Sequence, residues 1–149
     1  MYTDAVKYPP PNYPPPRGNH IQVSCFVDSN HASAIIKRRF QYGSILYCNK
    51  YPIIWYSKWQ ANMESSTFGS EFVALRVASE LIIYLCYKIL MFGIPILCHA
   101  DVFCDNEVVY NNTAFPESTL KNKHYLIFFH CVRECVASGI MIVHKVHNK

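Results

Sequence analysis

The sequence predicts an α/β fold with a mixed central sheet, in which three antiparallel strands are followed by parallel strands and helices flank the sheet. Three observations lead to this prediction. The length of 149 residues suits a single domain. Three runs with strand-like patterns follow one another near the start, and helical and strand-like patterns then alternate. The predicted order is strand, strand, strand, helix, strand, helix, helix, strand.

The composition favours a folded protein. Apolar residues make up 51% of the chain and charged residues 16%, which argues against disorder over most of its length. The net charge of +4 permits a polyanionic partner without requiring one. The seven cysteines form no C-x-x-C pair, which is typical of a reducing compartment, and the start lacks the pattern of a secretory signal. We therefore expect an intracellular protein, either cytoplasmic or nuclear.

A proline-rich segment precedes the predicted sheet. Residues 8–18 read YPPPNYPPPRG and contain six prolines, a composition that favours extended polyproline geometry over a packed element. We therefore expect residues 1–19 to form a tail or linker and residues 20–149 to form the folded domain.

The three consecutive strands are predicted from apolar and aromatic patterning. Residues 21–27 carry apolar side chains at every second position, so the first strand is expected to end at Asp28. Residues 40–48 and 52–58 are rich in aromatic and β-branched residues and are separated by a short turn. These two runs are expected to form an antiparallel hairpin.

A long helix is predicted over about residues 67–92, because apolar residues recur at helical spacing and Gly93 and Pro95 follow as stop signals. The helix contains most of the apolar run 81–98. Lys88 interrupts that run, so a buried helix is favoured over a membrane span and no membrane partner is expected.

The last part of the chain predicts four further elements. They are a short buried strand at residues 100–105, a short helix at 106–112, a helix at 123–139 ended by a glycine, and a strand at 140–146.

Three carboxylates are expected to converge at one edge of this sheet. Glu71 lies on the apolar face of the long helix, where an unpartnered carboxylate is costly to bury. Asp28 and Asp105 stand at the ends of two strands that should be neighbours, and ligands collect at the carboxyl ends of parallel strands. Together they would suit Mg²⁺ or Mn²⁺. Each residue alone could instead serve a turn, a cap or the helix dipole.

Spaced blocks along the chain resemble the ribonuclease H domain of Copia-type retrotransposon polyproteins, which also contain a reverse transcriptase. The similarity covers about residues 21–147. The blocks are VDSNHAS (27–33), YGSILYCNKYPIIWYSKWQANMESSTFGSEFVAL (42–75), FCDN (103–106) and STLKNKHYLIFFHCVRE (118–134). The resemblance implies a ribonuclease H-like fold that cleaves the RNA strand of RNA–DNA hybrids with two divalent ions. It also implies a reverse transcriptase domain upstream in the parent polyprotein.

The resemblance also implies roles for the three carboxylates. Asp28 would bridge two divalent ions, Glu71 would bind one of them and Asp105 would be a further ligand, so the three would also be the catalytic residues. The family continues after its last strand to a fourth carboxylate, whereas this sequence reads KVHNK. We therefore expect a domain that lacks its C-terminal segment and whose activity is weakened or lost.

A basic cluster lies between the first two predicted strands. Its members, Lys37, Arg38 and Arg39, are candidates for contacts with nucleic-acid phosphates. The alternative is a solvated turn, because short basic clusters are common on protein surfaces.

Two other functions stay open at this point. The chain could be a noncatalytic remnant, decayed or domesticated, that keeps the fold and some nucleic-acid binding. It could also be another α/β binding domain whose carboxylates are structural, which requires Asp28, Glu71 and Asp105 to lie apart.

Overall fold

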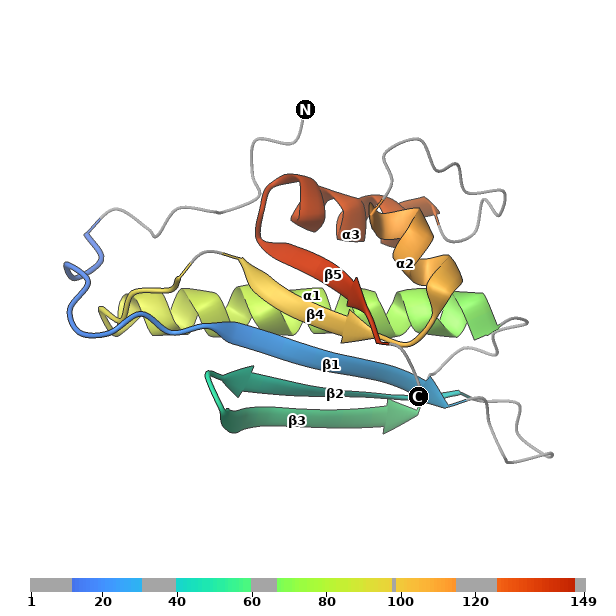
Figure 1. The fold of residues 1–149 in the computed structure, drawn as a ribbon, viewed down its shortest axis with the longest axis horizontal. Helices are drawn as coiled ribbons and strands as arrows, with labels where there is room; N and C mark the ends of the chain where they lie inside the picture. Colours follow the sequence, from blue (N-terminus) through green and yellow to red (C-terminus); the bar gives the residue numbers. More distant parts are fainter. Residues whose placement is uncertain (1–11, 31–39, 60–66, 98, 115–125, 147–149) are drawn as a thin grey trace.

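A computed structural model describes residues 12–30, 40–59, 67–97, 99–114 and 126–146 of the chain. Within these ranges one five-stranded sheet has the order β3-β2-β1-β4-β5 and is accompanied by three helices (Figure 1). The elements are β1 (Val23–Asn30), β2 (Gln41–Cys48), β3 (Tyr51–Trp59), α1 (Thr67–Met91), β4 (Ala100–Cys104), α2 (Glu107–Ala114), α3 (Leu126–Ala137) and β5 (Met141–Lys145). The predicted order of elements is confirmed.

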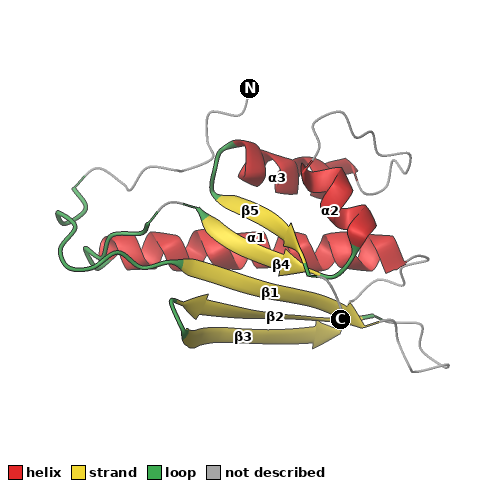
Figure 2. Cartoon of the chain, in the orientation of Figure 1, coloured by secondary structure: helices red, strands yellow, loops and turns green. Residues whose placement is uncertain are grey.

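The sheet is mixed, as the sequence predicts. Strand β2 pairs antiparallel with both β1 and β3, whereas β1 and β4 run parallel, as do β4 and β5 (Figure 2). Asn49 makes the turn between β2 and β3 with a φ of 56°, a left-handed conformation that asparagine tolerates. The first three strands thus form a meander, and each later strand is added after a helical connection.

Strand β1 extends further than predicted. Asp28 pairs with Gly43 of β2, and the ladder continues to the pair formed by Asn30 and Gln41. The prediction that this strand ends at Asp28 is therefore wrong. The apolar alternation marks the buried positions of a strand, whereas the length of the ladder depends on where the partner strand begins.

A single core lies between one face of the sheet and the helices. Helix α1 contributes Phe72, Leu75 and Ile82, each at most 1% exposed, and α3 contributes Val132, which is fully buried. From the sheet, alternate residues of β1, β2, β4 and β5 point into the same cluster. Burying each large side chain contributes about 2 kcal/mol, so this core holds α1 firmly against the sheet.

The opposite face of the sheet carries apolar side chains that are open to solvent. Trp55 is 75% exposed and Phe26 is 48% exposed. Phe26 stacks on Phe103 with 4.9 Å between ring centroids, and Phe103 stacks on His144 at 5.2 Å. An aromatic row therefore crosses β1, β4 and β5 on this face.

Helix α1 ends in a glycine cap. Gly93 has a φ of 74°, its N–H donates to the Leu90 carbonyl at 2.8 Å, and the Ile94 N–H donates to the Ile89 carbonyl at 3.1 Å. This pattern is a Schellman motif, as the predicted stop signal implies. No helix in the described part of the chain is both long and apolar enough to span a membrane.

Part of the proline-rich segment lies against this cap. The Arg17 N–H donates to the Gly93 carbonyl at 2.7 Å, and a side chain at position 93 would meet Pro14 and Pro15 at 3.4 Å. Residues 12–19 contain no helix or strand, and residues 1–11 lie outside the described ranges. The assignment of residues 1–19 as a tail or linker therefore stays a prediction.

Replacing Gly93 by alanine is expected to lower the free energy of unfolding by about 1 kcal/mol, because the left-handed backbone strains any residue with a Cβ atom. Urea unfolding would measure the change. Gly93→Asn is the matched control and should lose less, since asparagine tolerates this conformation. An alanine variant as stable as the wild type would contradict the prediction.

Candidate metal centre

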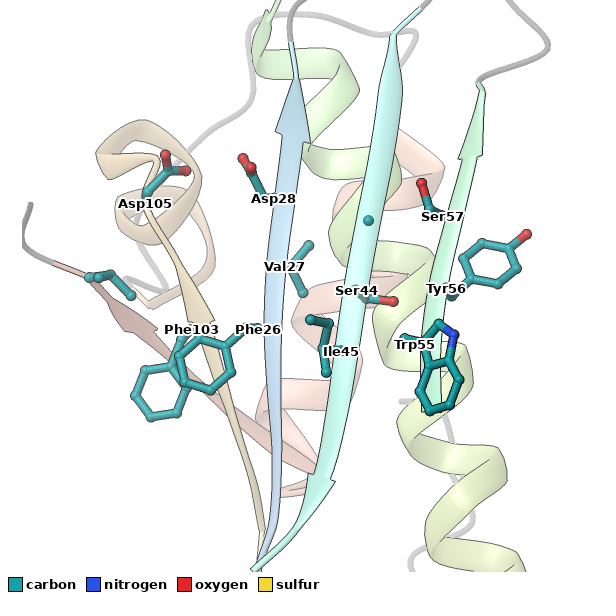
Figure 3. Close-up of a pocket in the computed structure, with 12 residues that line it drawn as sticks. Phe26, Val27, Asp28, Ser44, Ile45, Trp55, Tyr56, Ser57, Phe103 and Asp105 are labelled. Atoms are coloured by element: carbon teal, nitrogen blue, oxygen red, sulfur yellow. The ribbon is translucent and has the colours of Figure 1, made fainter. Parts of the chain in front are cut away.

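Three carboxylates meet near the carboxyl ends of β1 and β4. In the parallel ladder Phe26 pairs with Phe103, so Asp28 and Asp105, each two residues further along, stand level with each other. Glu71 reaches the same place from the start of α1. One oxygen from each carboxylate lies within 4.8 Å of the others. Figure 3 shows Asp28 and Asp105 side by side beyond the stacked rings of Phe26 and Phe103.

The three carboxylates differ in their exposure to solvent. Glu71 is only 8% exposed because α1 packs its apolar face on the sheet, whereas Asp28 and Asp105 are exposed. The pKa of Glu71 is raised from 4.5 to about 7, mainly because the group is buried. A hydrogen bond from Ser29 works against this rise, and the charges of Asp105 and Asp28 add to it. In the absence of a cation this buried carboxylate is therefore held in an unfavourable environment.

The arrangement fits a divalent cation. Among the described residues, the ion pairs join other groups, and none brings a lysine, arginine or histidine to Asp28, Glu71 or Asp105. Three close carboxylates without a cationic partner repel one another, and a bound cation would remove that repulsion. Carboxylate oxygens are hard donors that suit Mg²⁺ or Mn²⁺. These three residues could therefore hold such an ion.

Comparisons with known proteins find relatives in sequence and in fold. No protein-family model matches the chain. Two retrovirus-related Pol polyproteins from Arabidopsis thaliana transposons are 26% identical over 129 residues, which is 86% of this chain but 9% of each relative. The chain thus spans less than a tenth of the length of these relatives.

Solved structures of ribonucleases H share the fold. The N-terminal ribonuclease H domain of a Mycobacterium tuberculosis protein has a TM-score of 0.62 at 10% identity, covering 85% of this chain and 81% of that one. LC11 ribonuclease H1, solved in complex with an RNA/DNA hybrid, has a TM-score of 0.64 at 11% identity, covering 84% of this chain and 85% of that one. The chain has a ribonuclease H-like fold and is similar in sequence to retrotransposon Pol polyproteins. The fold and the resemblance predicted from the motifs are confirmed.

In this ribonuclease H-like domain the predicted carboxylates come together and the predicted basic residues stay untested. The close approach of Asp28, Glu71 and Asp105 contradicts the alternative in which they lie apart as unrelated structural residues. The basic cluster at positions 37–39 lies outside the described residues. Their contact with phosphates is still a prediction.

A groove adjoins the carboxylates on the open face of the ribonuclease H-like sheet. Its volume is about 460 Å³, and its lining includes Asp28 and Asp105 at one end and Phe26, Ile45 and Trp55 across β1 to β3 (Figure 3). Apart from the two aspartates the lining is uncharged. The exposed side of the candidate metal centre is therefore continuous with an apolar surface.

Two serines near Glu71 are absent from the sequence-based set of site residues. Ser29 follows Asp28 on β1, and Ser70 precedes Glu71 on α1; their Oγ atoms lie 3.1 Å apart. One feature of the sequence could have indicated Ser29: the alternation of β1 places this residue on the buried face of the strand. A serine in an otherwise apolar row indicates a polar partner, but the partner is visible only after α1 is packed on β1.

Proposed function

We propose that this ribonuclease H-like domain hydrolyses the RNA strand of RNA–DNA hybrids with divalent cations held by Asp28, Glu71 and Asp105. The observation that carries the proposal is the convergence of these three carboxylates within 4.8 Å. The substrate class is supported by the similarity to LC11 ribonuclease H1, which was solved with an RNA/DNA hybrid. The relation to Pol polyproteins supports a role in a retroelement.

The protein side chains would chiefly hold and orient the ions. Bound Mg²⁺ or Mn²⁺ would supply an activated water and stabilise the leaving oxygen of the cleaved strand. Glu71 contributes a ligand from the buried side, and its carboxyl group must be ionised to do so. Asp28 and Asp105 are exposed, so they present the centre on the side from which a nucleic acid can approach.

The proposal also includes basic contacts with the nucleic acid and an upstream domain of the parent polyprotein. Lys37, Arg38 and Arg39 would contact phosphates of the hybrid, an electrostatic contribution that weakens as salt increases. An upstream reverse transcriptase in the parent polyprotein would supply the hybrid, and the far greater length of the Pol relatives leaves room for it.

Cleavage of an end-labelled RNA–DNA hybrid tests the function. Product is expected with Mg²⁺ or Mn²⁺ and none with excess chelator, whereas the same RNA in a duplex with RNA should stay intact. A folded protein that binds Mn²⁺ but leaves the hybrid intact would overturn the proposal. That result would favour the noncatalytic remnant.

Cation binding should also stabilise the fold. Mn²⁺ at ten times its dissociation constant is expected to raise the free energy of unfolding by about 1.4 kcal/mol, because only the folded state assembles the three ligands. Thermal unfolding at pH 8 would measure this stabilisation. The Asp105→Asn variant should lose this stabilisation. The Asp101→Asn variant should keep it, because Asp101 lies at the other end of β4. If Mn²⁺ stabilised both variants equally, the ion would bind at a site other than the three carboxylates.

A further inference from the structure

We propose that the hydroxyl groups of Ser29 and Ser70 form a two-member relay that positions the Glu71 carboxylate toward Asp28 and Asp105. Both serines are positioning residues, since they act through Glu71. The inference rests on the proposed metal centre, and no role for either serine is implied by the resemblance to the retrotransposon family.

The relay begins at an unusual position of β1. Val23, Cys25 and Val27 are buried at every second position of this strand, and Ser29 is the next member of the same row. An apolar residue there would face Glu71 of α1, which is only 8% exposed. Ser29 instead places a hydroxyl group beside the buried carboxylate and donates a hydrogen bond to it.

The second member of the relay is Ser70. The Oγ atoms of Ser29 and Ser70 are 3.1 Å apart, and Ser70 is fully buried. A hydroxyl group carries one hydrogen, and an ionised carboxylate only accepts. With the hydrogen of Ser29 given to the ionised Glu71 carboxylate, the bond between the two serines would take its hydrogen from Ser70. Successive hydrogen bonds of this kind polarise one another, which strengthens the final bond to the carboxylate.

The relay links the two elements that carry the metal ligands. Ser29 is next to Asp28 on β1, and Ser70 is next to Glu71 on α1. A glutamate side chain has several rotatable bonds, so packing of the helix alone does not set where its oxygens point. Hydrogen bonds to metal-ligating carboxylates orient them, and their removal typically weakens metal binding about 10- to 100-fold.

Mn²⁺ titration monitored by electron paramagnetic resonance tests this role. Ser29→Ala is expected to raise the dissociation constant at least about 10-fold, and Ser70→Ala to raise it by less, because Ser29 still reaches Glu71. Ser29→Thr is the matched control, since it keeps the hydroxyl group and should bind within about 3-fold of the wild type. A Ser29→Ala protein that binds Mn²⁺ as tightly as the wild type would overturn the proposal.

A second measurement in metal-free buffer at pH 8 separates this proposal from the metal site. Ser29→Ala should lower the thermal midpoint of the wild type but not that of Glu71→Met, in which the acceptor is gone. Equal shifts in both backgrounds would overturn the relay even if Mn²⁺ binds. If Ser29→Ala lowers the midpoint of the wild type but not that of Glu71→Met, and the protein binds no Mn²⁺, then Ser29 positions Glu71 but the proposed metal function is wrong.

Discussion

Replacing Asp28 by asparagine is expected to lower the rate of RNA–DNA hybrid cleavage about 1,000-fold, which corresponds to about 4 kcal/mol of lost transition-state stabilisation. Asp28 faces both Glu71 and Asp105, so it contributes an oxygen to any ion that the other two hold. Asparagine has nearly the same shape but carries no charge. The expected loss therefore reflects weaker cation binding at the reacting phosphate rather than a change of fold.

The matched control for this variant is Asp101→Asn. Asp101 lies at the start of β4, remote from the centre, and accepts hydrogen bonds from Gln22 at 2.7 Å and from His144 at 2.8 Å. Its cleavage rate should stay within a few-fold of the wild type. Both rates come from the same labelled hybrid at the same subsaturating Mg²⁺ concentration. Undiminished cleavage by Asp28→Asn would remove Asp28 from the proposed site.

The Asp28→Asn variant is also expected to keep the fold of the wild type. Removing one of three mutually repelling charges is expected to raise the thermal midpoint in metal-free buffer. A midpoint below that of the wild type would mean that Asp28 stabilises the sheet, and the loss of cleavage would then need another explanation.

Glu71→Gln is expected to make the metal-free protein more stable at pH 8 by about 3 kcal/mol, the equivalent of a pKa raised from 4.5 to about 7. The raised pKa means that the folded state keeps the proton of Glu71 at pH values where the unfolded state has released it. The contribution of this group is therefore fully present below pH 4.5 and is lost as the pH rises through about 7. Glutamine has no proton to lose in this range.

Urea unfolding at pH 5 and pH 8, in chelator, measures this difference between Glu71→Gln and the wild type. Glu80→Gln is the matched control on the same helix. Glu80 is half exposed and pairs with Arg76 at 2.6 Å, so its replacement should change stability by less than about 1 kcal/mol at either pH. A Glu71→Gln effect of the same size at both pH values would mean that burial does not hold this carboxyl group protonated.

Local patterns predicted most of the fold. The alternation in β1 and the helical spacing in α1 report which side chains are buried, and Gly93 marks the end of the helix in sequence and structure alike. The far end of β1 could not be predicted in this way, because the ladder from Asp28 to Asn30 depends on the register of β2. Register is a property of two strands, and each strand alone does not contain it.

The order of the elements, the family resemblance and the identity of the three acidic residues could all be read from the amino-acid sequence. The folded chain adds that Asp28, Glu71 and Asp105 lie within 4.8 Å of one another and that Ser29 and Ser70 are hydrogen-bonded beside them. The physical reason is that Asp28 and Asp105 become level through the parallel pairing of β1 and β4, while Glu71 arrives through the packing of α1 on the sheet. Both contacts are long-range, so no local pattern records the distances that bring the carboxylates together.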